Sequence, residues 1–142
     1  MSDVRVFAIP LDLLDAIWGD ALTKLKPAVD QSNGRVSIDD VYHDILSGSS
    51  VLWMVRLKDQ PVAYYTTRVT AYPGSRAMVL EWIGGSDIKE WMTETIVAMR
   101  KHAAHNECSH IEFTGREGWT RLLKDTGWKP EYVSYRMELK DG

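Results

Sequence analysis

The sequence lacks the features that mark disulfide-rich, membrane-spanning or nucleic-acid-binding proteins. It contains one cysteine, Cys108, which excludes an internal disulfide framework and favours a reducing compartment. No apolar run approaches the roughly 20 residues needed to span a bilayer, and the first residues lack the basic and apolar regions of a signal peptide. The net charge is −3 and there is no basic tract, which disfavours binding to nucleic acid. We therefore expect a cytoplasmic protein with no membrane or nucleic-acid partner.

What the sequence does contain is typical of one globular domain. With 142 residues, it is long enough for a single core and too short for two comfortable ones. Hydrophobic residues make up 44% and charged residues 26%, which excludes a disordered chain. Six Trp and six Tyr indicate a core or a pocket rich in aromatic side chains. We expect residues 1–142 to form one domain.

Hydrophobic periodicity predicts alternating strands and helices. We expect strands at residues 4–9, 51–57, 62–72, 76–83, 110–114 and 132–139, and helices at 11–25, 38–46, 87–105 and within 114–127. Pro27 is expected to end the first helix, and Ser37 with Asp40 to cap the second. The element order is β-α-α-β-β-β-α-β-α-β, which predicts an α/β protein with a mixed sheet.

The stretch from Ala77 to Trp128 is the centre of this pattern. The strand at 76–83 is apolar at nearly every position, so we expect it to be central and covered on both faces. It ends at Gly84-Gly85, directly before the longest helix. Such a turn directs backbone N–H groups and a helix N-terminus to one point, which suits an anion. The alternative is a tight turn that needs glycine for its backbone angles alone.

The element order and several short motifs together resemble the GNAT superfamily of N-acetyltransferases. Local sequence is similar to small GNAT-like proteins encoded by tailed bacteriophages. The motifs are Leu52-Trp53-Met54-Val55, Val69-Thr70-Ala71-Tyr72-Pro73, Trp82-Ile83-Gly84-Gly85, Glu90-Trp91, Ile111-Glu112-Phe113-Thr114-Gly115-Arg116-Glu117-Gly118-Trp119 with Leu123, and Gly127-Trp128. The resemblance implies a GNAT-like acyl-CoA N-acyltransferase fold with a splayed central sheet.

The resemblance also implies acetyl transfer from acetyl-CoA to an amine, with the thioester arm between the splayed strands. The family's pyrophosphate loop corresponds to residues at the start of the long helix. The cofactor-binding residues implied are Trp82, Ile83, Gly84, Gly85, Ser86, Asp87, Ile88 and Arg116. This loop is shorter than the family pattern and lacks its basic residue. Trp119 also stands where the family often has a Tyr acid, and an indole N–H cannot act as an acid at neutral pH.

Glu81 lies on the expected central strand, where many enzymes of the family place a base. A catalytic role requires its carboxylate to point into the cleft, within reach of the amine. The alternative is a structural ion pair with a nearby arginine such as Arg68 or Arg76.

A cluster of histidines near Cys108 invites a zinc hypothesis because of its spacing. The members are His102, His105, Cys108 and His110. However, histidines at a helix end are common because they suit the helix dipole, and no second ligand cluster is visible. We expect no metal site.

Two functions therefore remain open at this point. The first is an acyltransferase that binds acetyl-CoA and acts on a small-molecule or protein amine, with Glu81 as the candidate base. The second is a non-catalytic component of a phage virion or of a host-interaction complex, built on a degenerate form of the same fold. Aromatic residues also serve interfaces, and the missing Tyr and basic residue favour this second function.

Overall fold

The computed structural model describes residues 3–140, and its centre is one five-stranded mixed sheet. The strands lie in the order β1-β2-β3-β4-β5, the same as their order along the chain. The first four pair antiparallel, and β5 pairs parallel to β4. The strands are β1 (Val4–Ala8), β2 (Val51–Leu57), β3 (Gln60–Ala71), β4 (Arg76–Gly85) and β5 (His110–Phe113). The predicted meander and the central place of the strand at 76–83 are confirmed.

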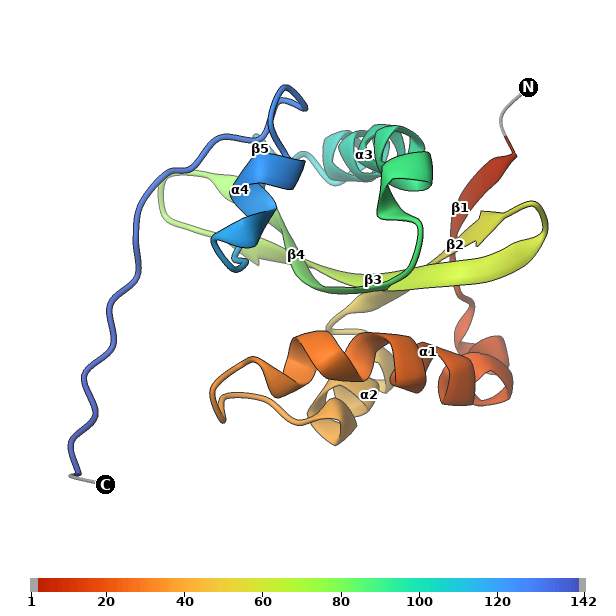
Figure 1. Cartoon of the computed structure of the whole chain (residues 1–142), viewed down its shortest axis with the longest axis horizontal. Helices are drawn as coiled ribbons and strands as arrows, with labels where there is room; N and C mark the ends of the chain where they lie inside the picture. The colour runs from red at the N-terminus through yellow and green to blue at the C-terminus, as the bar shows by residue number, and fades with distance from the viewer. Residues whose placement is uncertain (1–2, 141–142) are drawn as a thin grey trace.

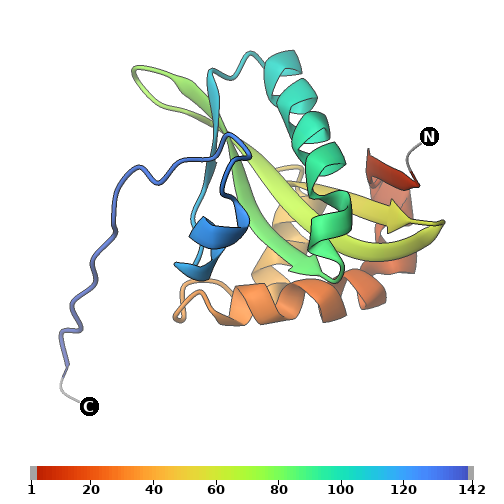
Figure 2. The same cartoon turned by 45° about the horizontal axis from the view of Figure 1, so that its top comes forward.

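Helices cover both faces of this sheet (Figures 1 and 2). A short 3-10 turn (Leu11–Leu13), α1 (Leu14–Asp30) and α2 (Ile38–Leu46) lie on one face. The other face carries α3 (Ile88–His105) and the short α4 (Gly118–Leu122). No helix within residues 3–140 is long and apolar enough to cross a membrane.

Each face of the sheet has its own hydrophobic core. On the α1–α2 face, the buried cluster comprises Ile9, Leu14, Ala21, Leu25, Val29, Val41, Ile45, Leu52, Met54 and Tyr64. On the α3–α4 face, it comprises Val55, Ala63, Tyr65, Met78, Leu80, Ile83, Trp91, Met99 and Ala103. The split follows from the alternation of side chains along the strands, which sends successive residues to opposite faces.

Local sequence signals set the start of α2, whereas packing sets the end of α1. Ser37 and Asp40 form the predicted capping box: the Ser37 hydroxyl accepts from the Asp40 N–H at 3.2 Å, and the Asp40 carboxylate accepts from the Ser37 N–H at 2.9 Å. The prediction that Pro27 ends α1 is wrong, because the helix continues to Asp30. The continuation keeps Val29 fully buried, which offsets the backbone hydrogen bond that a proline inside a helix cannot make.

A β-bulge interrupts the pairing of β3 with β4. Thr66 is opposite Trp82 and Thr67 is opposite Leu80, so Glu81 has no opposing residue. An extra residue of this kind turns the strand locally and redirects side chains. Leu80 and Ile83 both pack into the α3–α4 core, whereas Trp82 packs against the other core.

The chain after β5 departs most from the sequence-based expectations. The helix expected within 114–127 is reduced to α4, which has five residues. The strand predicted at residues 132–139 is wrong: this part of the chain forms no strand and leaves the body of the molecule (Figures 1 and 2). Alternation predicts which residues share a face, but a strand also requires a neighbouring strand to pair with. No strand within residues 3–140 pairs with this segment.

Candidate functional site

The candidate site begins where β4 and β5 part. The two strands pair over four positions, from Ala77 opposite His110 to Leu80 opposite Phe113. β4 then continues to Gly85, whereas β5 ends at Phe113. Beyond Leu80, one edge of β4 therefore lacks β5, and the chain of β4 leads directly into the N-terminus of α3. This is the splayed arrangement expected from the sequence.

The two glycines expected to form a loop lie instead at the end of β4, opposite residues of β3. A Cβ atom on Gly84 would lie 2.0 Å from the backbone oxygen of Lys24, because α1 crosses β4 at this point. Gly85 has φ +145°, a conformation that favours glycine. The close packing at Gly84 and the backbone conformation at Gly85 therefore explain both glycines without a phosphate. The phosphate site predicted at this turn therefore depends on Ser86, Asp87 and the first turn of α3.

The connection between β4 and α3 is short, and the Trp91 side chain of α3 bonds to it. Asp87 precedes the helix in the left-handed conformation, with φ 60°, and its side chain caps no N–H group. The buried Trp91 indole donates to the Ser86 carbonyl at 2.6 Å. The N–H groups of Ile88 and Lys89 belong to the first turn, where a helix supplies no acceptor. These N–H groups could therefore face an anion. The Asp87 carboxylate, which accepts from the Ser86 hydroxyl at 3.1 Å, belongs to the residue directly before them.

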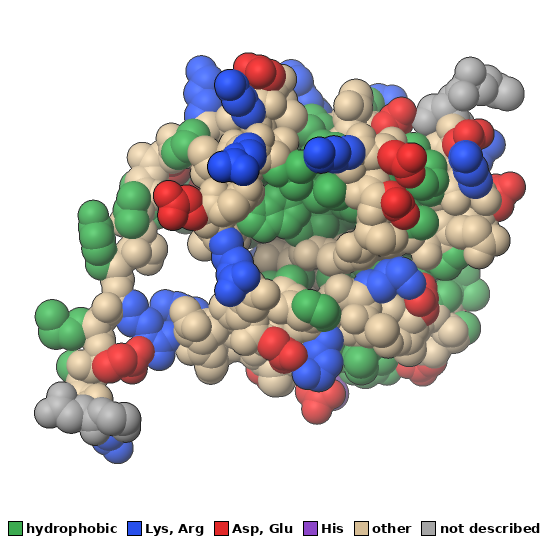
Figure 3. Space-filling view, viewed as in Figure 1, with side chains coloured by type: hydrophobic (Ala, Val, Ile, Leu, Met, Phe, Trp, Pro, Cys, Tyr) green, Lys and Arg blue, Asp and Glu red, His purple; other side chains and the backbone are tan. Residues whose placement is uncertain are grey.

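Aromatic side chains fill the gap between the parted strands. The Phe113 ring packs edge to face on Trp119, with centroids 5.1 Å apart, and lies 6.1 Å from Trp128. Gly115 allows this contact, since a Cβ there would lie 2.8 Å from the Trp119 ring. The cavity that remains is about 10 Å³, close to the minimum for one water molecule. Figure 3 shows a patch of hydrophobic side chains between α3 and α4.

Ile83 and Trp82 therefore differ in their relation to this gap. Ile83 borders it, together with Met92 of α3. Trp82, on the opposite face, is half-buried against the α1–α2 core. The sequence did not single out Phe113 and Trp128 for this site, although the surplus of aromatic residues was a signal for a core or pocket of this kind.

Glu81 is held by two partners on the α1–α2 face. Its carboxylate accepts from the Ser50 hydroxyl at 2.7 Å and from Arg68 Nε at 3.0 Å, so each oxygen has a donor. Arg68 also donates to Asp44 of α2 at 2.7 Å. Burial acts to lower the pKa of Arg68, but Glu81 and Asp44 outweigh it and raise that pKa above its ordinary value. The structural ion pair weighed from the sequence is present, with Arg68 as the partner.

A second polar chain follows the same face at the start of β5. The Tyr72 hydroxyl donates to Glu112 at 2.7 Å, and the other Glu112 oxygen lies 2.8 Å from His110 Nε2. The hydrogen bond from Tyr72, helped by His110, holds the pKa of Glu112 below its ordinary value. The Ser109 hydroxyl lies 2.8 Å from His110 Nδ1. This polar network was not foreseen from the sequence, because Tyr72 lies in the β3–β4 turn and the other members lie more than 30 residues later, at the start of β5.

The remaining candidates do not converge on the gap. Arg116 is exposed in the turn between β5 and α4. Within residues 3–140, the structure contains no group of three His, Cys, Asp or Glu side chains that could hold a metal ion. The His102 ring packs edge to face on Trp53, and burial lowers the pKa of His102. His110 bonds to Ser109 and Glu112 as described, so these two histidines point to different partners.

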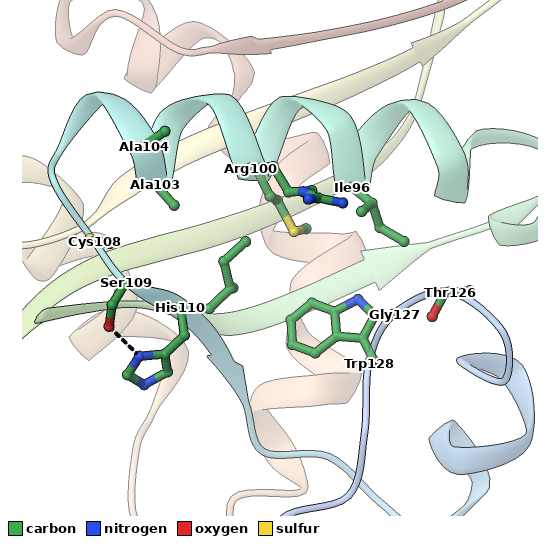
Figure 4. Close-up of a pocket in the computed structure, with 12 residues that line it drawn as sticks. Ile96, Arg100, Ala103, Ala104, Cys108, Ser109, His110, Thr126, Gly127 and Trp128 are labelled. Carbon is green, nitrogen blue, oxygen red and sulfur yellow. Dashed lines mark hydrogen bonds between the residues drawn. The ribbon is translucent and has the colours of Figure 1, made fainter. Parts of the chain in front are cut away.

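A larger groove adjoins this gap on the α3 face of β5, near the C-terminal end of α3 (Figure 4), and Ile96, Met99 and Trp128 line both. It has a volume of about 520 Å³ and is bounded by α3, β5 and the segment after α4. Its apolar lining includes Ile96, Met99, Ala103, Ile111 and Trp128. No residue expected to bind a cofactor lines it.

Several solved structures similar to this chain are acetyltransferases. An aminoglycoside N-acetyltransferase in complex with CoA has a TM-score of 0.68 and 11% identity, over 99% of this chain and 97% of that chain. A predicted acetyltransferase from Clostridium acetobutylicum with acetyl-CoA has a TM-score of 0.67 and 10% identity, over 96% of each chain. Glucosamine-6-phosphate N-acetyltransferase from Arabidopsis thaliana has a TM-score of 0.65 and 9% identity, over 96% of this chain and 99% of that chain.

These likenesses show that the chain has the GNAT acetyltransferase fold along nearly its whole length. No protein-family model matches the sequence, and no curated protein matches it. None of the three structures named above is described as a bacteriophage protein, so the phage resemblance stays a prediction. At these identities the fold is shared, and function must be argued from the site.

Proposed function

We propose that this protein is an acyltransferase that uses acetyl-CoA to acetylate an amine. The observation that carries the proposal is the parting of β4 and β5 beyond Leu80 and Phe113, directly before the N-terminus of α3. The ligands named for two similar structures, CoA and acetyl-CoA, support the same cofactor. When bound, acetyl-CoA supplies an acetyl group activated as a thioester.

The residues at the mouth of the gap fit the phosphate end of this cofactor in part. The N–H groups of Ile88 and Lys89 and the positive end of the α3 dipole would face a pyrophosphate. The exposed Lys89 side chain adds a cation on the same turn. Asp87 opposes binding, because its carboxylate adds a like charge. Arg116, on the turn after β5, remains the candidate for a second contact with the cofactor.

The gap itself fits the thioester arm only after a side chain moves. Phe113, Trp119 and Trp128 occupy the space that the arm would need. Of the elements around it, α4 has the weakest support: it has five residues and none of them is buried. We therefore propose that Trp119 and α4 move outward when acetyl-CoA binds.

Glu81 is the residue proposed to accept the proton of the amine, which would have to approach from the α1–α2 face, because the carboxylate lies on that face. Each of its oxygens accepts one hydrogen bond, from the Ser50 hydroxyl or from Arg68, and each keeps a second lone pair that could accept from the amine or from a bridging water. The Ser50 hydroxyl and Arg68 stabilise the ionised form of Glu81, which opposes transfer of a proton to it. The alternative, a non-catalytic phage virion or host-interaction protein, has no contact among the described residues in its favour.

Calorimetry and thermal unfolding with acetyl-CoA test the proposal. We expect acetyl-CoA and CoA to raise the unfolding temperature, since a ligand that binds only the native state stabilises it. Acetyl phosphate, which lacks the nucleotide and the arm, serves as the control and should have no effect. No heat and no shift at millimolar acetyl-CoA would reject the proposal.

Two matched variants sharpen this test. Asp87→Asn removes the opposing charge and keeps a residue that tolerates a positive φ. We expect it to bind acetyl-CoA about threefold more tightly, the effect of one nearby exposed charge. Glu107→Gln removes a carboxylate at the opposite end of α3, also at positive φ, and should leave the affinity unchanged. Equal effects of the two variants would exclude a phosphate site at Asp87.

A further inference from the structure

Two arginines face each other across the outermost strand pair of the sheet. β1 lies at one edge of the sheet and pairs with β2 (Figure 1). In this pairing Arg5 is directly opposite Arg56, and side chains in such positions have Cβ atoms about 5 Å apart. Like charges placed directly opposite destabilise a sheet. The pair therefore lowers the stability of the sheet unless an anion binds to both arginines.

Alternation places both arginines on the α1–α2 face of the sheet. Val4 and Val6, the neighbours of Arg5 in β1, pack against the core on the α3–α4 face, and Val55, the neighbour of Arg56 in β2, belongs to that core. Successive side chains of a strand point to opposite faces. The two guanidinium groups thus share one face of the sheet, and their charges lie close together.

No carboxylate within residues 3–140 forms an ion pair with either arginine. Arg56 donates from Nη2 to the backbone oxygen of Asp59 at 3.0 Å, and its buried Nε has no hydrogen-bond partner among these residues. Asp15 and Asp20 of α1, the helix on this face, accept from tyrosine hydroxyls instead. A guanidinium group has five N–H donors, so most of the donors of Arg56 are unused.

A partly exposed aromatic ring continues this surface along β1. Phe7 is the next residue on the same face as Arg5, about 7 Å along the strand, and it is 37% exposed. It lies opposite Met54, which is buried in the α1–α2 core. A ring beside two guanidinium groups suits a phosphate that is attached to an aromatic group, because ring and phosphate then have separate partners.

We propose that Arg5 and Arg56 bind the phosphate group of a small aromatic phosphate monoester, whose ring packs against Phe7. Guanidinium groups present planar sets of donors that match phosphate oxygens in bidentate geometry. A phosphate dianion between the two arginines neutralises both charges. β1 and β5 are opposite edges of the sheet, so this site is separate from the gap between β4 and β5 and does not depend on acetyl-CoA.

Thermal unfolding at constant ionic strength tests the proposal without acetyl-CoA. We expect phenyl phosphate at ten times its dissociation constant to raise the unfolding temperature by about 5 °C relative to sodium chloride. At the same concentration inorganic phosphate should give a smaller rise, because it has no ring to contact Phe7. An equal effect of phenyl phosphate and sodium chloride would overturn the proposal. Equal affinities for phenyl phosphate and inorganic phosphate would overturn the contact with Phe7.

Arg5→Gln separates this site from any other place where phosphate binds, such as the N-terminus of α3. In sodium chloride the variant should unfold about 2 °C above wild type, because the repulsion between the arginines is removed. It should also lose the response to phenyl phosphate. Arg35→Gln, at an exposed arginine that donates to the Ser32 carbonyl in its own loop, is the matched control and should keep the wild-type response.

Nuclear magnetic resonance locates the bound phosphate on the wild-type chain. In a titration with phenyl phosphate, the Nε–H signals of Arg5 and Arg56 should shift over the concentrations that raise the unfolding temperature. Signals of both arginines that stay unchanged at saturation would contradict the assignment. A thermal response of the same size in Arg5→Gln and wild type would do so as well.

Discussion

The two faces of the sheet are covered by different kinds of helix. On one face α1, with 17 residues, crosses β4 closely enough for its backbone to contact Gly84, and α2 begins with a complete capping box. On the other face α3 has 18 residues, but α4 has five and buries none of them. The first face is thus closed by backbone packing, and the second depends on aromatic rings packed under a short helix.

This difference indicates which face can open for a ligand. Moving α1 would break contacts of fully buried residues such as Ala21 and Leu25. Moving α4 would expose Trp119, which is already half-exposed, and would break the turn bonds of a single short helix. Segments with few buried contacts open at low free-energy cost. The face that carries the proposed cofactor gap is therefore the adaptable one.

The largest effect should come from Gly84→Ala. The new Cβ would lie 2.0 Å from the Lys24 backbone oxygen, so α1 must shift as a unit. We expect a loss of about 3 kcal/mol in the free energy of unfolding, the upper end of overpacking effects, measured by urea denaturation. Gly19→Ala, on the same helix with open space around it, is the control and should stabilise by about 1 kcal/mol. Equal effects of both changes would contradict the close contact.

Trp119→Ala and Trp18→Ala compare the two faces directly. Both side chains are half-buried, Trp119 beside Phe113 and Trp18 beside Tyr42. Each variant should lose about 2 kcal/mol in unfolding free energy, less than full burial would give. Only Trp119→Ala should bind acetyl-CoA more tightly in calorimetry, because no ring has to be displaced. If Trp18→Ala changed the affinity equally, the assignment of the gap to the α3–α4 face would be wrong.

Arg68→Ala tests the ion-pair cluster that holds Glu81. The variant leaves Glu81 and Asp44 without their shared cation. We expect a loss of about 1 kcal/mol, discounted because the Arg68 side chain is 34% exposed. Lys26→Ala removes the exposed pair with Asp30 and should change stability by less than about 0.5 kcal/mol. Thermal and urea unfolding of the two variants would separate them.

The smallest effect should come from Asp40→Asn, and it should depend on pH. Hydrogen bonds from the Ser37 backbone and side chain hold the pKa of Asp40 below its ordinary value of 3.8. A lowered native pKa stabilises the fold above the unfolded pKa, and this contribution is lost as the pH falls through the native pKa. The variant should therefore be less stable than wild type at pH 7 and nearly equal to it at pH 2. A difference that grew in acid would contradict this sign.

The fold was predictable wherever short-range signals agreed with packing. The Ser37–Asp40 cap, the meander and the order of elements through β5 follow from local chemistry and periodicity. The prediction at Pro27 was wrong because burial of Val29, two residues later, offsets the hydrogen bond that the proline cannot make. A rule based on local sequence alone does not include that burial. The segment at 132–139 misled because its alternation is real but no strand within residues 3–140 pairs with it.

The site was predictable in outline and not in detail. The parting of β4 and β5 followed from the fold, and Arg68 was named among the partners of Glu81. The close approach of α1 to Gly84 could not be foreseen, because it depends on where two elements 60 residues apart cross. The filling of the gap by Phe113, Trp119 and Trp128 depends in the same way on how the chain returns after α4.

The bulge at Glu81 has a consequence for how this strand can vary. The extra residue shifts the alternation of side chains by one position. Before the bulge, the even-numbered residues Met78 and Leu80 face α3, and after it the odd-numbered Ile83 faces α3. Deletion of Glu81 would restore strict alternation and keep Ile83 on the α3 face and Trp82 on the other. A single-residue deletion should therefore be tolerated at the bulge, whereas elsewhere in β4 it would move the following side chains to the opposite faces.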